Sequence, residues 1–248
     1  MPPPIRIAVL ECDTPLTQTR ERYGGYGGVL TKLLHSAADA IHMPREALDI
    51  SKWDVVNGAG EYPALDDIDA ILITGSRFNA FDNDPWIVRL VEFVRMVLSQ
   101  DRVRVIGVCY GHQIVARVLG AKVARSEGGA WEASVCDVYL TPRGKELFRK
   151  EALSMFQMHK DLVYYYPQGV EELAWSDKCK VQGMYIAKRV ITVQAHPEFT
   201  EPIVREILET RRQQNIFDED TYQDALARVV KPQDGVVVGE AFLRFLVE

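Results

Sequence analysis

The sequence is poor in cysteine and lacks long apolar stretches. Four cysteines occur in 248 residues, and no two of them have the CxxC spacing that is typical of zinc sites and dithiol redox motifs. We therefore expect no metal site and no disulfide framework, but reduced thiols in a cytoplasmic protein. No run of 18 apolar residues is present, so we also expect no transmembrane helix.

Basic clusters and targeting segments are missing as well. The chain carries 29 Lys and Arg against 35 Asp and Glu, a net charge of −6, and it has no basic run of five residues. Nucleic acids and anionic membranes are bound through clustered basic side chains, so we expect neither as a partner. The first residues, MPPPIRIAVLEC, contain three prolines and an apolar run that is too short for a secretory signal.

What the sequence does contain is the alternating pattern of an α/β protein. Hydrophobic residues make up 47% of it, which is enough for one large domain or at most two small ones. In the first half, buried-strand patterns over Ile5–Leu10, Ala70–Thr74 and Val103–Val108 alternate with helical patterns. This alternation predicts a parallel sheet with helices on both faces. The helical patterns cover Val29–Ala40, the segment after Pro85, and Ile114 to Leu119.

The second half of the chain has a different pattern of predicted elements. Short strand-like runs with turns between them come before one further buried strand, and helical segments close the chain. The strands are predicted over Ser134–Leu140, Glu172–Trp175, Gln182–Ile186 and Val190–Gln194. The helices are predicted over Pro202–Arg212, Thr221–Val230 and Gly239–Val247.

Cys109 lies where a predicted strand passes directly into a helix. Gly107 and Gly111 flank it, a setting typical of a nucleophile elbow, in which the absence of Cβ atoms lets the backbone turn sharply and a substrate approach. The helix N-terminus favours a thiolate. The backbone N–H of Tyr110 and that of the turn at Gly75 would then bind an oxyanion. The alternative is that Cys109 is a buried core residue, as we expect for the remaining cysteines, Cys12, Cys136 and Cys179.

His196 and Glu198 follow the last predicted buried strand. Two residues that are two positions apart at a strand end share a face, so Glu198 can hold one ring nitrogen while the other accepts the proton of Cys109. Alone, such a pair is more often found on the surface. The preceding strand and the candidate nucleophile elsewhere favour a catalytic relay.

Two local motifs together resemble a known family. GVCYGHQ over residues 107–113, followed 87 positions after Cys109 by HPE over residues 196–198, resembles the signature of the class I glutamine amidotransferases, which are also classed with the C26 peptidases. The resemblance implies a flavodoxin-like fold, an open, mostly parallel sheet with helices on both faces and a small antiparallel sheet addition. It also implies a single domain over residues 1–248, with 213–248 as a C-terminal helical extension.

The resemblance implies a role for each candidate residue. Cys109 would be the nucleophile, His196 the general base and acid, Glu198 the orienting carboxylate, and the backbone of Gly75 and Tyr110 the oxyanion hole. The glutamyl group would be held by Gln113, Met158, His159, Lys160 and Asp161. The family often has glycine where Lys160 stands. No metal and no cofactor are implied.

QMHKD over residues 157–161, together with GVCYGHQ, resembles stand-alone members related to the γ-glutamyl peptidases of plants and to uncharacterised fungal and bacterial homologues. The implied reaction is hydrolysis of the γ-carbonyl amide of glutamine or of γ-glutamyl compounds through a γ-glutamyl thioester. Two alternatives stay open: a glutaminase subunit that supplies ammonia to a separate synthetase, and a non-catalytic regulatory protein on the same fold. The expected partner is a small glutamine or γ-glutamyl substrate, and a synthetase or a second copy of the chain also stays open.

Two further segments are candidates for the surroundings of the site. GGYGG over residues 24–28 looks like a dinucleotide fingerprint, but Leu30 stands where its third glycine would be, so we expect a flexible loop near the site. Arg125, Trp131 and Glu132 follow the helix of the candidate nucleophile and are candidates for a specificity pocket.

Overall fold

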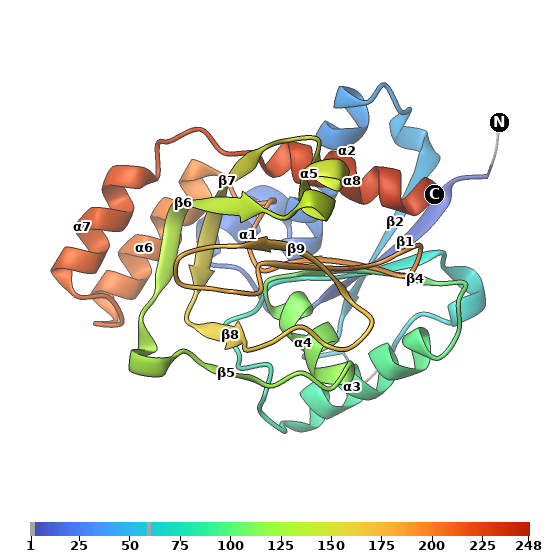
Figure 1. The fold of residues 1–248 in the computed structure, drawn as a ribbon, viewed down its shortest axis with the longest axis horizontal. Coiled ribbons are helices and arrows are strands. Elements are labelled where there is room, and N and C mark those ends of the chain that lie inside the picture. Colours follow the sequence, from blue (N-terminus) through green and yellow to red (C-terminus); the bar gives the residue numbers. More distant parts are fainter. Residues whose placement is uncertain (1–2, 59–60) are drawn as a thin grey trace.

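A computed structural model describes residues 3–58 and 61–248 of the chain (Figure 1). Met1 and Pro2, which begin the segment that we expect not to be a secretory signal, lie outside the described residues. Within the described residues, the main feature is a nine-stranded mixed sheet with helices on both of its faces.

Parallel strands form one half of the sheet. They are β1 (Ile5–Glu11), β2 (Leu48–Asp54), β3 (Ala70–Ile73), β4 (Arg104–Val108) and β11 (Val190–Val193). Their order is β2-β1-β3-β4-β11. Both β3 and β11 are buried along their whole length, as expected of parallel strands that are covered on both faces. The carboxyl ends of these strands therefore meet at one edge of the sheet, where ligands of such folds bind.

Antiparallel strands continue the same sheet beyond β11. In spatial order they are β10 (Gly183–Ile186), β9 (Glu171–Trp175), β6 (Glu132–Leu140) and β7 (Ala152–His159). A separate two-stranded antiparallel sheet joins β5 (Val123–Arg125) to β8 (Asp161–Val163). The predicted flavodoxin-like, mostly parallel sheet with an antiparallel addition is thus confirmed, and most of the addition is continuous with the main sheet.

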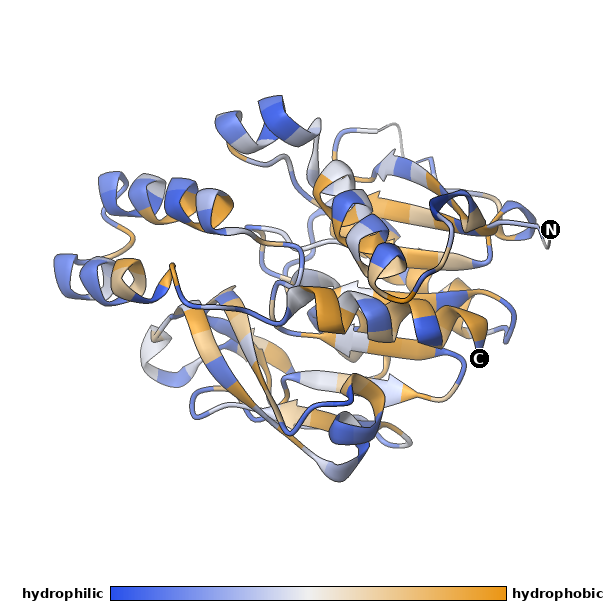
Figure 2. Ribbon diagram, turned by 90° about the horizontal axis from the view of Figure 1, so that it is seen from above, coloured by the Kyte–Doolittle hydropathy of each residue, from blue (hydrophilic) through white to orange (hydrophobic). Residues whose placement is uncertain are grey.

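Helices cover both faces of the parallel half. One face carries α2 (Tyr26–Ala40) and α8 (Gly235–Val247), and the other carries α3 (Pro85–Leu98) and α4 (Tyr110–Val118) (Figure 1). Side chains of a strand alternate between the faces, so Ile7 and Val9 of β1 share the core of α2 and α8, while Ala8 and Leu10 share that of α3 and α4. Figure 2 shows the strands as predominantly hydrophobic and the helices as mixed, as expected of amphipathic helices on a sheet.

The remaining helices lie around the antiparallel half. They are α1 (Thr17–Tyr23), α5 (Pro142–Phe148), α6 (Glu201–Gln213) and α7 (Glu219–Arg228). Val204 and Leu208 of α6 and Ala225 of α7 share a core with Val135 of β6 and Phe156 of β7, which places α6 beside the edge where the strands end. The division of the chain into one domain with an extension at 213–248 stays a prediction.

The sequence patterns missed two strands of the sheet. Only Leu48 of β2 is buried, because this strand lies at the edge of the sheet, so it has no apolar pattern. The opposite edge strand, β7, is largely buried, but Gln157 and His159 interrupt its apolar pattern because they contact other buried polar side chains. The short helices α1 and α5 were also not predicted. The ends of the predicted elements differ from the observed ones by a few residues.

The prediction of a loop over residues 24–28 is wrong in its second half. Helix α2 begins at Tyr26, so Gly27 and Gly28 lie in its first turn. A Cβ atom on Gly28 would lie 1.8 Å from the carbonyl oxygen of Tyr23. The glycine is therefore required by the close approach of α1 and α2 and not by flexibility.

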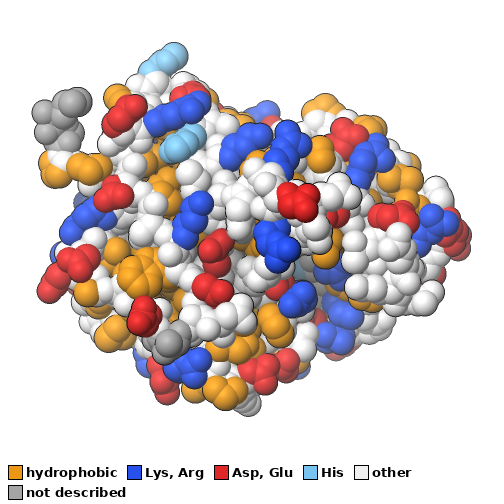
Figure 3. Space-filling view, turned by 180° about the vertical axis from the view of Figure 1, so that it is seen from behind, with side chains coloured by type: hydrophobic (Ala, Val, Ile, Leu, Met, Phe, Trp, Pro, Cys, Tyr) orange, Lys and Arg blue, Asp and Glu red, His pale blue; other side chains and the backbone are white. Residues whose placement is uncertain are grey.

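The described surface shows no single dominant charge on the face seen in Figure 3, where acidic and basic side chains are interspersed. Among residues 3–58 and 61–248, no helix is long and apolar enough to cross a bilayer. Of the cysteines predicted in the core, Cys12 and Cys179 are buried. The prediction is wrong for Cys136, which is half-buried beside Arg228.

Candidate active site

Cys109 is the N-cap of α4, at the sharp turn that joins β4 to this helix. Its backbone has φ 50° and ψ −97°, a region that residues with a side chain rarely occupy. Two hydrogen bonds hold the turn: the Cys109 N–H donates to the Val193 carbonyl at 2.8 Å, and the Cys109 carbonyl accepts from the Gln113 N–H at 3.1 Å. Cys109 as a residue is 4% exposed and lines a cavity, so it is not sealed inside the protein. A strained residue that is held in this way is typical of a functional site.

The glycines on either side of Cys109 serve chain packing. A Cβ atom on Gly107 would lie 2.8 Å from the backbone of Gly111, and one on Gly111 would lie 2.4 Å from the carbonyl oxygen of Ile73. The expected reason for these glycines, room for a substrate, is therefore corrected. They let α4 lie directly on β3 and β4, which places the thiol at the end of the sheet.

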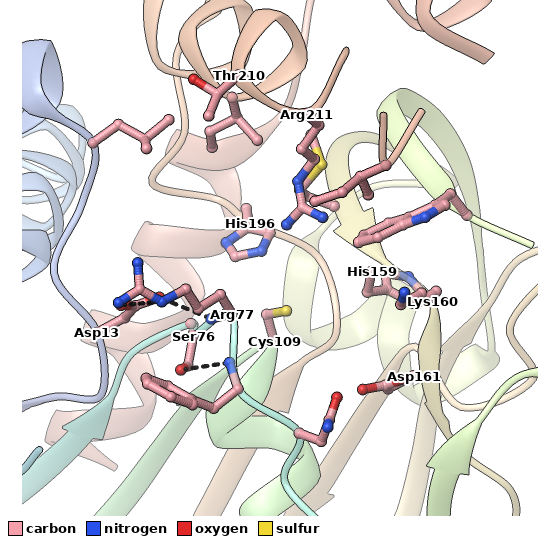
Figure 4. A pocket seen from close by; sticks show the side chains of 18 of the residues that line it. Asp13, Ser76, Arg77, Cys109, His159, Lys160, Asp161, His196, Thr210 and Arg211 are labelled. Atoms are coloured by element: carbon pink, nitrogen blue, oxygen red, sulfur yellow. Dashed lines mark hydrogen bonds and ion pairs between the residues drawn. The ribbon is translucent and has the colours of Figure 1, made fainter. Parts of the chain in front are cut away.

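His196 lies in a turn after the end of β11, not at the end of a strand as predicted. Its Nδ1 atom is 2.8 Å from Oε1 of Glu198, and its ring stacks on Phe199 with 3.9 Å between the centroids. Its backbone N–H donates to the Phe156 carbonyl at 2.8 Å. The turn, and not a shared strand face, brings the two side chains together. Figure 4 shows the fixed ring directly beside Cys109.

The charge of His196 is stabilised from two sides. Burial of the ring opposes its charged form, but the negative charges of Cys109 and Glu198, and hydrogen bonds to both, outweigh burial and raise the pKa of His196 to about 10. The imidazolium is therefore the favoured form of the ring when it lies between a thiolate and a carboxylate.

Gly75 and Tyr110, the predicted oxyanion donors, belong to the two segments beside Cys109. Gly75 follows β3 and lines the cavity, and a Cβ atom there would lie 2.6 Å from Cε1 of His196. The loop is held by Asp13, whose carboxylate accepts a hydrogen bond from the Arg77 N–H at 2.9 Å. Tyr110 is the first residue of α4, where backbone N–H groups have no partner within the helix.

Sequence reasoning missed Gln194, which touches the thiol. Its Nε2 atom is 3.5 Å from Sγ of Cys109, and its Oε1 atom accepts a hydrogen bond from Nε2 of Gln113 at 3.0 Å. Gln113 also donates to the carbonyl of Asp161 at 3.0 Å. A chain of buried amides thus links Gln113 to Cys109. The available signal was the position of Gln194, two residues before His196.

All of the residues predicted to hold a glutamyl group line the cavity: Gln113, Met158, His159, Lys160 and Asp161. His159 is the last residue of β7, and Asp161 is the first residue of β8. Nε2 of His159 lies 3.1 Å from Oε2 of Glu132. Burial raises the pKa of Glu132, but its interactions with His159, Ser176 and Lys178 outweigh burial and lower the pKa overall. The ring of His159 is therefore directed at Glu132.

The cavity in front of Cys109 and His196 has a volume of about 390 Å³, within the range of small-molecule sites (Figure 4). Of the three candidates for a specificity pocket, Arg125 and Trp131 line it, whereas Glu132 turns to His159 instead. A further wall comes from α6 and was not predicted, because its residues are distant in sequence from both motifs. These residues are Ile207, Thr210 and Arg211.

The site can be compared with known proteins. The model of the family Glutamine amidotransferase class-I matches residues 37–215. The chain belongs to this family. A glutamine amidotransferase-like protein of Schizosaccharomyces pombe is 32% identical over 246 residues, which covers 98% of each chain. The class I glutamine amidotransferase resemblance drawn from the two motifs is thereby confirmed.

More distant proteins are also similar to this chain. Gamma-glutamyl peptidase 2 of Arabidopsis thaliana is 26% identical over 234 residues, which covers 91% of this chain and 89% of that protein. The crystal structure of a glutamine amidotransferase from Thermotoga maritima is 16% identical and superposes with a TM-score of 0.74, covering 98% of this chain and 99% of that one.

Proposed function

We propose that this chain is a cysteine hydrolase that cleaves the γ-carbonyl amide of glutamine or of γ-glutamyl compounds. The observation that carries the proposal is the connected set of Cys109, His196 and Glu198, of which Cys109 and His196 line a cavity. Family membership and the γ-glutamyl peptidases among the relatives support it. Neither a cofactor nor a metal ion takes part in the proposed steps.

The first proposed step forms a thioester. The Cys109 thiolate attacks the γ-carbonyl carbon, and the electron pair of the C=O bond moves to oxygen. The backbone N–H groups of Gly75 and Tyr110 bind that oxyanion. The C–N bond then breaks, and the leaving nitrogen takes a proton from the His196 imidazolium, so that an amine or ammonia departs.

The second proposed step releases glutamate. Water attacks the thioester carbon and gives a proton to the now neutral His196, and the C–S bond breaks to restore the Cys109 thiolate. Glu198 exchanges no proton with the substrate in either step; it holds Nδ1 of the ring and stabilises the imidazolium. The sum of both steps is the addition of one water across the amide.

We assign recognition of the glutamyl group to the side of the cavity where the hydrogen-bonded amides of Gln194 and Gln113 lie. Gln113, Met158, His159, Lys160 and Asp161 line it. The ammonium of Lys160 lies 5.0 Å from the ring centroid of Trp131 and would attract the α-carboxylate of the substrate. Gln113 would position the same end of the substrate, because its amide is already fixed by hydrogen bonds.

The cavity continues past Cys109 to Thr210 and Arg211 of α6, which leaves room for a leaving group larger than ammonia (Figure 4). This favours a γ-glutamyl hydrolase over a glutaminase subunit that delivers ammonia to a synthetase. The test is to incubate the protein with glutamine, glutathione and γ-glutamyl dipeptides and to detect glutamate, amine and ammonia by mass spectrometry. We expect amine release from the γ-glutamyl compounds. Turnover of glutamine alone would favour the glutaminase, and turnover of none would overturn the proposal.

Replacing Gly75 with alanine should lower kcat for these substrates by about 100-fold, because a new methyl group 2.6 Å from Cε1 of His196 must displace the ring. The measurement is steady-state kinetics with thermal unfolding. Gly169→Ala is the control: Gly169 is exposed and has φ 80°, so alanine there strains the backbone and lowers Tm away from the site. Equal losses of kcat in both variants would contradict a local effect at His196.

A further inference from the structure

Two of the basic side chains at the cavity are already neutralised. Nε of Arg77 lies 3.5 Å from Asp13, and Nε of Arg125 lies 3.1 Å from Asp161. In each pair the carboxylate offsets the positive charge of the arginine, so neither arginine needs an anionic ligand as a counter-ion. Figure 4 shows the Arg77–Asp13 pair on one side of Cys109 and Asp161 on another.

Two other cations of the same cavity have no such partner. Within residues 3–58 and 61–248, no carboxylate lies within 4.0 Å of Lys160 or Arg211. Each lies over the ring of Trp131, the ammonium of Lys160 at 5.0 Å and the guanidinium of Arg211 at 4.2 Å from the centroid. The two positive charges repel each other because both lie over the same indole ring. Binding of two negative charges in the cavity would therefore be favourable.

Arg211 is held in place rather than free to swing into solvent. Its guanidinium also lies 5.7 Å from the ring centroid of Phe217, and Phe217 meets Trp131 edge to face at 5.1 Å. Burial lowers the pKa of Arg211, although the nearby negative charges of Cys109 and Asp13 oppose that shift. Within the described residues neither group forms an ion pair with the guanidinium, so an anionic ligand in contact with it would offset the cost of its partial desolvation.

The position of Arg211 indicates which end of a substrate it faces. Figure 4 shows its guanidinium next to His196, on the α6 side of the cavity, while Lys160 and Asp161 lie farther from His196. In the proposed reaction, His196 gives its proton to the leaving nitrogen. The leaving group must therefore extend toward His196 and, beyond it, toward Arg211.

We propose that Arg211 binds a carboxylate on the leaving group, so that the preferred substrates are γ-glutamyl amino acids or peptides whose leaving part has a free carboxylate. Lys160 then faces the carboxylate of the glutamyl part and Arg211 that of the leaving part. A guanidinium fits this task because it binds a carboxylate through two parallel hydrogen bonds. This inference rests on the proposed function and names its substrate class.

The test compares acid and amide forms of the same substrate. For γ-glutamylalanine against γ-glutamylalaninamide, and for glutathione against its glycinamide form, we expect the wild type to favour the acid by about 10- to 100-fold in kcat/KM in at least one pair. Arg211→Gln should remove that preference, mainly through KM of the acid, with a smaller change for the amide and for glutamine. Arg211→Lys should retain part of the preference, because it keeps the charge but not the planar fork.

The matched control is Arg212→Gln, at the next position of α6. Arg212 is exposed, pairs with Glu219 at 2.9 Å and lies outside the cavity wall, so the preference for the acid should persist. Equal kcat/KM for acid and amide in the wild type, or an unchanged preference in Arg211→Gln, would overturn the inference and leave the proposed function intact. An equal loss for acid, amide and glutamine would also overturn it. Absence of turnover with every γ-glutamyl compound would overturn both.

Discussion

Replacing Cys109 with alanine is expected to abolish hydrolysis of glutamine and γ-glutamyl substrates, a loss of at least about 10⁴-fold in kcat. Without the sulfur no thioester can form, and His196 loses the negative charge that it faces. The fold should be unaffected, because alanine is no larger than cysteine and the turn is held by backbone hydrogen bonds. The measurement is substrate turnover by mass spectrometry, with circular dichroism and Tm to compare folding.

Cys136→Ala is the control for loss of a thiol. Cys136 is half-buried on β6, outside the residues that line the cavity, so this variant should keep the activity of the wild type. A second readout is the mass of the trapped intermediate: the wild type, but not Cys109→Ala, should gain the mass of a glutamyl group during turnover. Undiminished turnover in Cys109→Ala would contradict the proposed mechanism.

Replacing Glu198 with glutamine is expected to lower kcat by about 10²- to 10⁴-fold. Glutamine is isosteric with glutamate, so the packing around the turn should persist. It carries no charge, however, and its amide group can hold the His196 ring in the wrong tautomer. In the wild type, a hydrogen bond of 2.8 Å between Nδ1 of His196 and Oε1 of Glu198 fixes this nitrogen of the ring. Steady-state kinetics on the best substrate from the profile measures the loss.

The pH profile of the Glu198→Gln variant distinguishes loss of charge from loss of structure. In the wild type the pKa of His196 is raised to about 10, so the ring keeps its proton until the pH approaches that value, and activity should fall only above it. Removing the carboxylate takes away one cause of the raised pKa, so the alkaline limb should move to lower pH. An alkaline limb at the wild-type position, together with a lowered Tm, would indicate structural damage instead.

Local sequence patterns predicted most of the parallel half of the sheet, because buried strands such as β3 and β11 are short apolar runs with clear ends. They failed at β2 and β7, where exposure or buried polar contacts remove the apolar pattern. They also placed His196 and Glu198 correctly as neighbours, but for the wrong reason, since a turn and not a strand joins them.

The site was accessible from the sequence only where its residues form compact motifs. Cys109 with its flanking glycines, and His196 with Glu198, each lie within a few positions of one another, so their chemistry can be recognised along the chain. Gln194 was missed because it lies 85 positions from the thiol that it contacts, and no local periodicity encodes such a contact. The same holds for the wall that α6 contributes to the cavity.

From the order of its amino acids alone, the chain specifies the strand-to-helix turn at Cys109, the family and the general chemistry, because these depend on residues close together along the backbone. The selectivity of the cavity depends instead on packing. Trp131 from the start of the antiparallel half, Lys160 beyond β7 and Arg211 from α6 meet only after the sheet has formed and α6 has closed against it. Long-range contacts of this kind bring the two cations without a carboxylate partner to one indole ring. The inferred preference for a substrate with two carboxylates follows from that arrangement.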